Sequence, residues 1–269
     1  MCRLYAVTRG GYYAWRHRRP SARSEENQRL LKCIERAHAQ SHETYGSPRI
    51  QRALCVQGVR VGRNRVARLM RKHQIHARAA RIYRANAGVH RFFEAIPAQR
   101  LKVLSLHPNA VWVGDITYLK LGTAWRYLAT VMDRCTRRVI GWSLGAKKDV
   151  RLTLRALDRA VHRCRPRPGL IFHSDRGTEY AGYVFRDRLA ELGIVQSMNE
   201  RVNDNAHMES FYHSMKSEVI HGVSFDEERQ LQRVVSGYIH FYNERRLHSS
   251  IGYVAPATHE QNLSRRGVN

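Results

Sequence analysis

The chain has 269 residues, and its 47 Lys and Arg against 22 Asp and Glu give a formal net charge of +25 at pH 7. A field of this sign attracts polyanions, so nucleic acid is the expected partner and an anionic membrane surface the weaker alternative. Hydrophobic residues make up 43% of the chain, which supports a packed core and excludes wholesale disorder. No apolar run approaches the roughly 18–20 residues that cross a bilayer, so we expect no membrane-spanning segment.

The cysteines are scattered along the chain and form no CxxC pair, so the sequence predicts neither a zinc knuckle nor a disulfide framework. The first residues, MCRLYAVTRGGYYAW, lack the apolar segment of a signal peptide. Together these observations favour the reducing environment of the cytoplasm.

Residues 1–77 are strongly basic and carry helical patterns. A helix is expected over residues 25–39, where apolar side chains recur at helical spacing: Leu30, Leu31, Ile34 and Ala37. Ser47 and Pro48 predict the start of a second helix, because Pro is favoured at the first helical position, and Gly58 predicts its end.

A third helix is expected after Gly62, with Val66, Leu69 and Met70 on its apolar face. Its other face carries basic and amide side chains: Arg63, Asn64, Arg65, Arg68, Arg71 and Lys72. A helix, a short turn and a second helix with a basic face are typical of a helix-turn-helix domain, here at about residues 45–77. We expect this face to contact DNA, and the alternative is a solvated basic face on a small helical bundle.

Residues 78–108 show no sustained periodicity and are expected to form a basic linker. From residue 110, runs of β-branched and aromatic residues between tight turns predict three strands in an antiparallel meander. Further strands are expected at GLIFHSD and GIVQSM, between helices over residues 149–164, 183–192 and 205–220. This order predicts an α/β fold with a mixed five-stranded sheet and flanking helices over residues 109–222. A last helix, at about residues 226–245, belongs to a C-terminal region of residues 223–269.

Three acidic residues of this region have unusual positions. Asp115 lies inside an apolar strand, where a lone carboxylate is costly unless a positive charge compensates it. Asp175 lies just past the carboxyl end of another strand, a usual location for sites in such sheets, and Glu209 lies one turn into a helix. Three converging carboxylates would repel one another unless divalent cations neutralise them, and their oxygens suit Mg²⁺ or Mn²⁺.

Two such ions about 3.5–4 Å apart can activate an attacking oxygen and stabilise the leaving oxygen of a phosphodiester. Asp at a strand end and Glu in a first helical turn are also common structural caps. The residues by themselves therefore leave a catalytic and a structural interpretation open.

Five stretches carry a family resemblance: TYGSPRI with RNRVARLMR, VWVGDITYL, HSDRGTEY, DNAHMESFYHSMKSE and the tail YNERRLHSSIGYVAPATHE. The chain resembles the transposase catalytic subunit, OrfB, of bacterial insertion sequences of the IS-three group, within the DDE transposase and retroviral-integrase superfamily. The resemblance spans nearly the whole chain. It implies an RNase H-like core and identifies Asp115, Asp175 and Glu209 as the catalytic, metal-binding triad.

The resemblance also gives an expected spacing for the triad. Asp115 and Asp175 stand 60 positions apart, which is ordinary for the family, whereas Glu209 follows Asp175 by 34, about two fewer than usual. We expect the loop NERVND, just before the last catalytic helix, to absorb this difference. Glu179 stands where the family usually carries Gln and is expected to be a neighbour of the metals, not a ligand.

Lys216 lies seven residues after Glu209 and therefore on the same helix face, two turns on. We expect it to contact a DNA phosphate beside the metals, as the resemblance to integrases also implies, and the alternative is a solvated helix lysine. For Tyr212 and His213, one turn after Glu209, groove lining and packing are both open.

The expected function is DNA transposition, in which water or a 3′-hydroxyl attacks a DNA phosphodiester with the help of two Mg²⁺ or Mn²⁺ ions. The resemblance implies a bacterial, nucleoid-associated protein that binds the ends of its element and a target DNA, acts as a homo-multimer, and works with an upstream OrfA part as partner or frameshift fusion. Two alternatives stay open: a catalytically weak DNA-binding regulator, and an RNase H-like nuclease that degrades RNA–DNA hybrids.

Overall fold

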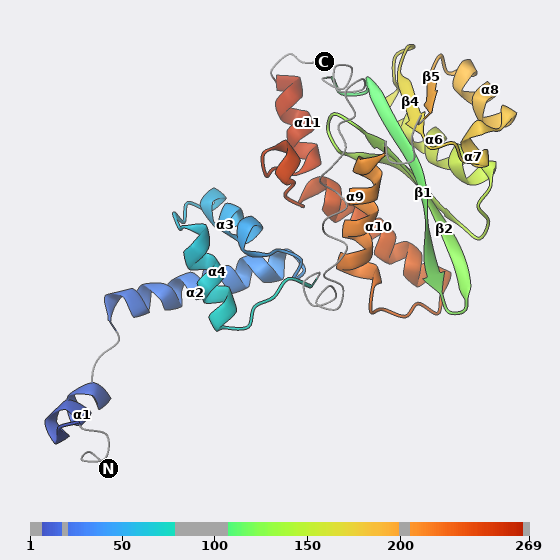
Figure 1. The fold of residues 1–269 in the computed structure, drawn as a ribbon. Coiled ribbons are helices and arrows are strands. Elements are labelled where there is room, and N and C mark those ends of the chain that lie inside the picture. The colour runs from blue at the N-terminus through green and yellow to red at the C-terminus, as the bar shows by residue number, and fades with distance from the viewer. Residues whose placement is uncertain (1–6, 18–20, 79–106, 199–204, 266–269) are drawn as a thin grey trace. The chain divides into compact units, whose positions relative to one another are not determined.

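The structure, a computed structural model, describes residues 7–17, 21–78, 107–198 and 205–265 (Figure 1). The chain divides into two compact units, Met1–Ala77 and Arg78–Asn269. Residues 79–106, which make up most of the expected linker, and residues 199–204, which form the loop expected to absorb the shorter spacing, lie outside the described residues.

The first unit is helical over its described residues. Its helices are α1 (Arg9–Arg16), α2 (Ala22–Gln40), α3 (Ser47–Val56) and α4 (Arg63–Lys72). Of the side chains predicted to face inward on α2, α3 and α4, Leu31 is only half-buried and the others are buried: Leu30, Ile34, Ala37, Ile50, Leu54, Val66, Leu69 and Met70. The helix before Gly58 and the helix after Gly62 are therefore confirmed, and they pack on α2 through one small apolar core.

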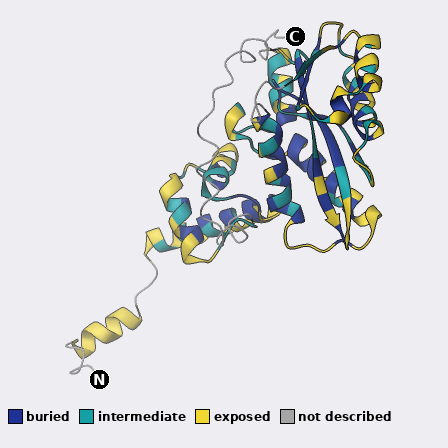
Figure 2. Cartoon of the chain, turned by 45° about the vertical axis from the view of Figure 1, so that its right-hand side comes forward, coloured by how far each residue is buried: buried dark blue, intermediate teal, exposed yellow. Residues whose placement is uncertain are grey.

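Helix α1 was not predicted. It begins after Thr8, whose side chain accepts a hydrogen bond from the backbone N–H of Gly11 at 3.0 Å, as an N-cap does. None of its residues is buried, and Figure 2 shows it exposed along its whole length. Because none of its residues is buried, this helix has no core-facing side of the kind that the sequence patterns detect.

The second unit is built on a five-stranded sheet with the order β3-β2-β1-β4-β5. The strands are β1 (Val111–Leu121), β2 (Ala124–Asp133), β3 (Val139–Gly145), β4 (Ile171–Ser174) and β5 (Val195–Met198). The first three pair antiparallel, as the predicted meander requires, β4 pairs in parallel with the other edge of β1, and β5 pairs in parallel with β4. The predicted mixed sheet is confirmed.

Helices cover the sheet on both faces (Figure 1). One face carries α6 (Val150–Cys164), α7 (Thr178–Ala181) and α8 (Tyr183–Glu191), which bury an apolar cluster against Trp112, Val131 and Phe172. The other carries α9 (Ala206–Met215) and α10 (Glu228–Glu244). The chain continues through a 3₁₀ turn, Ser249–Ile251, into α11 (Pro256–Arg265).

The contact between β3 and α6 depends on a glycine. A Cβ atom at Gly141 would lie 2.2 Å from the carbonyl oxygen of Ala156 and 2.8 Å from the nitrogen of Ala160. Both of those residues are fully buried on α6. The absence of a side chain at Gly141 therefore allows the helix to lie directly on the strand.

Three helical features differ from the expectation. The helix expected to run to residue 220 is α-helical only to Met215 and continues as a π-helical turn, Lys216–Ile220. The short helix α7 and the C-terminal helix α11 were not predicted, although Pro256 at the first position of α11 is a usual helix start. No helix in the described ranges is long and apolar enough to cross a membrane.

Candidate active site

The site begins where β1 loses one of its neighbours. β4 pairs with β1 only as far as the register pair Val113 and His173, whereas β1 stays paired with β2 to Leu121. Residues of β4 stand opposite residues of β1 that are 60 positions earlier, and the same interval separates Asp115 from Asp175. Asp115 and Asp175 thus each stand two positions past the last residue pair, where β1 and β4 no longer pair.

Asp115 is held in an environment that disfavours its charge. The pKa of Asp115 is raised to about 7, mainly by burial and in addition by the negative charges of Asp175 and Glu209. The backbone N–H of Ile116, which donates to Asp115 Oδ1 at 2.7 Å, and the charge of Lys148 act in the opposite direction. The three predicted acids therefore lie within electrostatic reach of one another.

Helix α9 brings Glu209 to this place through two hydrogen bonds to β1. The side-chain amide of Asn205, just before the helix, donates to the carbonyl oxygen of Gly114 at 3.0 Å. One turn after Glu209, the Tyr212 hydroxyl is 2.6 Å from the carbonyl oxygen of Asp115 and 2.7 Å from Thr130 Oγ1. Tyr212 is buried, so it packs and positions α9 and does not line an open groove.

The donor set suits a hard divalent cation, because all three side chains offer carboxylate oxygens. Asp115 also has a negative environment that a cation would relieve. Across the described residues, no three or more His, Cys, Asp and Glu side chains are arranged as a ready-made metal cage. The structure thus places the acids as neighbours, and their joint coordination of a metal stays a prediction.

The loop after β4 crowds two carboxylates around Gly177. The backbone N–H of Gly177 donates to Asp175 Oδ1 at 3.1 Å. A Cβ atom at Gly177 would lie 3.0 Å from Asp175 Oδ1 and 2.6 Å from Glu179 Oε2. Glu179 is buried and its Oε1 pairs with Lys148 Nζ at 3.2 Å. Lys148 is a residue of the site that the sequence did not reveal, because nothing near it in the chain marks it as the partner of Glu179.

Lys216 lies over the ring of Tyr118 on β1 and within electrostatic reach of Asp115. Its Nζ is 5.2 Å from the centroid of the Tyr118 ring, a cation–π distance. Burial lowers the pKa of Lys216, and the charge of Asp115 partly opposes that shift. The lysine is thus close enough to feel Asp115, while its contact with a DNA phosphate stays a prediction.

The basic face of α4 is largely open to solvent. Five of the six side chains assigned to DNA are exposed: Arg63, Asn64, Arg68, Arg71 and Lys72. Arg65 differs, because its guanidinium pairs with Glu26 at 2.8 Å and donates to Asn27 Oδ1 at 2.8 and 3.0 Å. Arg65 therefore joins α4 to α2, and its part in DNA binding stays a prediction with less structural support than that of its neighbours.

Arg68→Ala and Arg65→Ala should consequently have different effects. Loss of a phosphate-contacting Arg68 should weaken binding of duplex DNA and reduce the slope of log Kd against log salt by about 1. Arg65→Ala should instead lower the thermal unfolding midpoint of the first unit and change the salt slope less. Salt titrations of a labelled duplex and thermal unfolding of both variants measure this contrast. A larger slope change for Arg65→Ala, with an unaltered midpoint, would contradict it.

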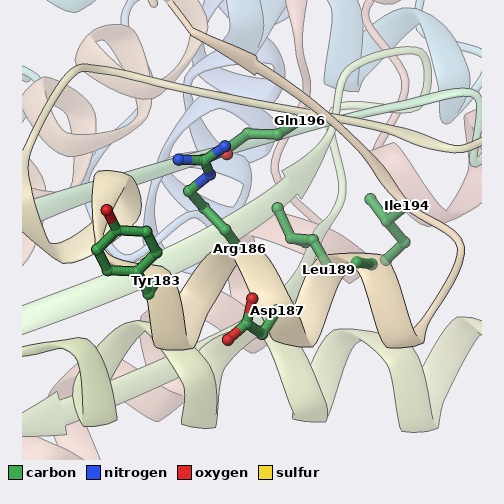
Figure 3. A pocket seen from close by; sticks show the side chains of 7 residues that line it. Tyr183, Arg186, Asp187, Leu189, Ile194 and Gln196 are labelled. Carbon is green, nitrogen blue, oxygen red and sulfur yellow. The ribbon is translucent and has the colours of Figure 1, made fainter.

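A separate hollow of about 340 Å³ lies between α8 and β5 (Figure 3). The labelled side chains that line it are Tyr183, Arg186, Asp187, Leu189, Ile194 and Gln196. None of the three acids lines this hollow, so it is distinct from the acidic cluster.

Comparison with known families finds matches in both units of the chain. Residues 105–203 and 209–263 both match the family described as Integrase core domain, and residues 25–83 match the HTH-like domain. Asp115 and Asp175 fall in the first integrase match, and Glu209 is the first residue of the second. The protein is therefore a polynucleotidyl transferase of the integrase and transposase class, with a helix-turn-helix-like domain.

Two relatives are similar over almost the full chain. The Insertion element IS600 uncharacterized 31 kDa protein of Shigella sonnei is 36% identical over 261 residues, which cover 96% of each chain. Transposase InsF for insertion sequence IS3A of Escherichia coli strain K12 is 34% identical over 266 residues, covering 97% of this chain and 92% of the relative. The chain belongs to the IS3 family of insertion-sequence transposases.

Among solved structures, the HTLV-2 integrase catalytic core domain in complex with magnesium aligns with a TM-score of 0.47 at 16% identity. The alignment covers 58% of this chain and 99% of that one.

Proposed function

We propose that this transposase cuts DNA at the ends of its element and joins them to a target, with Asp115, Asp175 and Glu209 as the catalytic, metal-binding residues. The observation that supports the proposal is that Asp115 and Asp175 each stand two positions past the last residue pair of β1 and β4, Val113 and His173. Glu209 is tied beside them through Asn205 and Tyr212.

The three carboxylates would hold two Mg²⁺ or Mn²⁺ ions. When bound, such ions activate the attacking oxygen and stabilise the leaving oxygen of a phosphodiester. The raised pKa of Asp115 supports this assignment, since a half-buried carboxylate beside two others is an expected site for a compensating cation.

The site also has to position the DNA. Asp115 is fixed within a strand and Glu209 on a helix, so the acids are carried by rigid elements on which a reacting phosphate can be oriented. Lys216, which lies within electrostatic reach of Asp115, contacts a DNA phosphate. The exposed basic face of α4 holds the element ends.

Transposition brings two element ends together, so the active form is a homo-multimer. An OrfA partner, separate or fused by frameshifting, supplies further DNA binding. The competing proposal is a DNA-binding regulator with weak catalysis, and the observation that favours it is the interval of 34 positions between Asp175 and Glu209, which is shorter than usual for the family.

One assay separates the proposals. The full chain is incubated with labelled duplex ends, Mg²⁺ and a target plasmid, and with an RNA–DNA hybrid in parallel. Joined products support the transposase, retention of the duplex without cutting supports the regulator, and degradation of the hybrid alone supports an RNase H-like nuclease. Omission of Mg²⁺ is the control for metal dependence.

Glu179 offers a test of which acid after β4 is the ligand. Asp175→Asn should reduce the rate of end cutting at least about a thousandfold, which is about 4 kcal/mol of transition-state stabilisation. Glu179→Gln should keep the rate within about tenfold, because Glu179 is already paired with Lys148 and a Gln fills the same space. Equal losses in single-turnover cutting assays would mean that Glu179 shares the role assigned to Asp175.

A further inference from the structure

The β1–β2 hairpin carries an exposed pair of aromatic rings. Tyr118 and Trp125 keep 57% and 51% of their surface exposed, and Figure 2 shows the far end of this hairpin open to solvent. Their ring centroids are 5.8 Å apart with an interplanar angle of 80°. Tyr118 on β1 and Trp125 on β2 project from one face of the sheet, because Trp125 pairs with Lys120 and residues two apart share a face.

This aromatic pair is connected to the acidic cluster by Lys216. Tyr118 is three residues after Asp115 on the same strand and therefore points to the opposite sheet face. Lys216 nevertheless lies over the Tyr118 ring and also feels the charge of Asp115. It can do both because β4 ends its pairing at Val113, so this part of the β1 edge is bordered by no strand of the described chain.

We propose that Tyr118, Trp125 and Lys216 form a stacking platform for an unpaired nucleotide next to the phosphodiester that is cut or joined. The proposal rests on the DNA-cutting function proposed above. Aromatic rings stack on any base, and a neighbouring lysine binds the phosphate of the same nucleotide, which is the usual combination in proteins that hold single-stranded DNA.

Charge selects this occupant over a second copy of the chain. The platform lies beside Lys120 and Lys216, and the whole chain carries a net charge of +25. The two lysines attract the negative phosphates of a DNA strand, whose bases can stack on the rings, whereas the net charge of a second copy gives this surface no such attraction. An enzyme that reaches into a duplex also benefits from holding the nucleotide that leaves the stack.

The test compares two DNA probes on the full chain with the Asp115→Asn substitution, which removes cutting. One probe is a duplex with a short unpaired extension that contains 2-aminopurine, and the other is the same duplex with a blunt end. Tyr118→Ala and Trp125→Ala should each bind the extended probe about tenfold more weakly and lose its fluorescence change, with unchanged affinity for the blunt probe. Tyr118→Phe and Trp125→Phe should keep both the affinity for the extended probe and its fluorescence change, since these variants retain an aromatic ring.

Tyr183→Ala is the matched control, because Tyr183 is 81% exposed on α8 and belongs to neither the platform nor the acidic cluster. The platform is overturned if Tyr118→Ala and Trp125→Ala leave the extended probe unaffected, or if they weaken both probes equally. Cutting by the parent chain is scored separately. If the unsubstituted chain fails to cut DNA but the alanine variants lose affinity for the extended probe alone, only the proposed function is refuted. If the unsubstituted chain cuts DNA and the alanine variants bind both probes normally, only the platform is refuted.

Discussion

Asp115→Asn is expected to reduce Mg²⁺-dependent cutting and joining of DNA ends at least about a thousandfold, or about 4 kcal/mol in the barrier. The substitution removes one of the carboxylates proposed to hold the metals and leaves the shape of the side chain. Its oxygen can still accept the hydrogen bond from the Ile116 amide, so the strand should keep its conformation. DNA affinity should stay within about twofold, because the basic face of α4 and Lys216 are unaltered. Cutting is measured with labelled duplex ends and affinity with a fluorescent duplex.

Asp158→Asn provides a matched control for this experiment. Asp158 is an exposed acid on α6 that pairs with Arg188, outside the acidic cluster, so its substitution should leave cutting unchanged. Without metal, Asp115→Asn also removes a buried charge that Asp175 and Glu209 repel. The metal-free unfolding midpoint of this variant should therefore equal or exceed that of the parent chain. Full cutting by Asp115→Asn would refute the triad, and a lowered midpoint would indicate damage to the fold.

The arrangement of Asp115 and Asp175 illustrates what sequence patterns can give. The apolar runs around both residues predict two strands, and the runs between them predict the intervening strands and helix, all of which the structure contains. The register of β1 against β4 is a non-local property, since it depends on how the whole crossover packs. The sequence alone could therefore propose that the two acids meet, and the resemblance to a family could name them, but the point at which β1 and β4 stop pairing needed the fold.

Lys148 and the π turn at Lys216 show why the rest was not predicted. Lys148 stands before α6, and its partner Glu179 lies on α7, so the pair exists only in the folded chain. The pattern after Glu209 continues smoothly to Ile220 as an α-helix would, yet the structure widens to a π turn from Lys216. That widening coincides with a buried contact between Glu218 and Arg246, which are far apart in the sequence. Local periodicity carries no information about either contact.

The Glu218–Arg246 pair leads to the second large expected effect. Arg246 Nη2 is 2.6 Å from Glu218 Oε1, and the side chains are only 2% and 4% exposed. The Tyr238 hydroxyl donates to Glu218 Oε2 at 3.0 Å, and Arg246 Nη2 donates to Ser214 Oγ at 3.1 Å. These hydrogen bonds join the end of α9 and the π turn to the end of α10, so the pair fixes the segment that carries Lys216.

Arg246→Met should lower the free energy of unfolding of the second unit by about 3–5 kcal/mol, because it leaves the Glu218 charge buried without a positively charged partner. Adding Glu218→Leu should recover much of that loss, since a buried ion pair replaced by apolar side chains is often neutral. Chemical denaturation of the parent, both single variants and the double variant gives the coupling energy directly.

Arg188→Met is the control for the same measurement, because Arg188 forms ion pairs with Asp158 and Glu191 at the surface. It should cost less than about 1 kcal/mol, as exposed pairs usually do. A cost for Arg246→Met no greater than that of Arg188→Met would show that the buried pair does not hold the π turn. A large cost with a strong recovery in the double variant would show that the burial of an unpaired charge, more than the attraction itself, makes the pair indispensable. In that case the position of Lys216 depends on the pairing of Glu218, in the same π-helical turn, with Arg246.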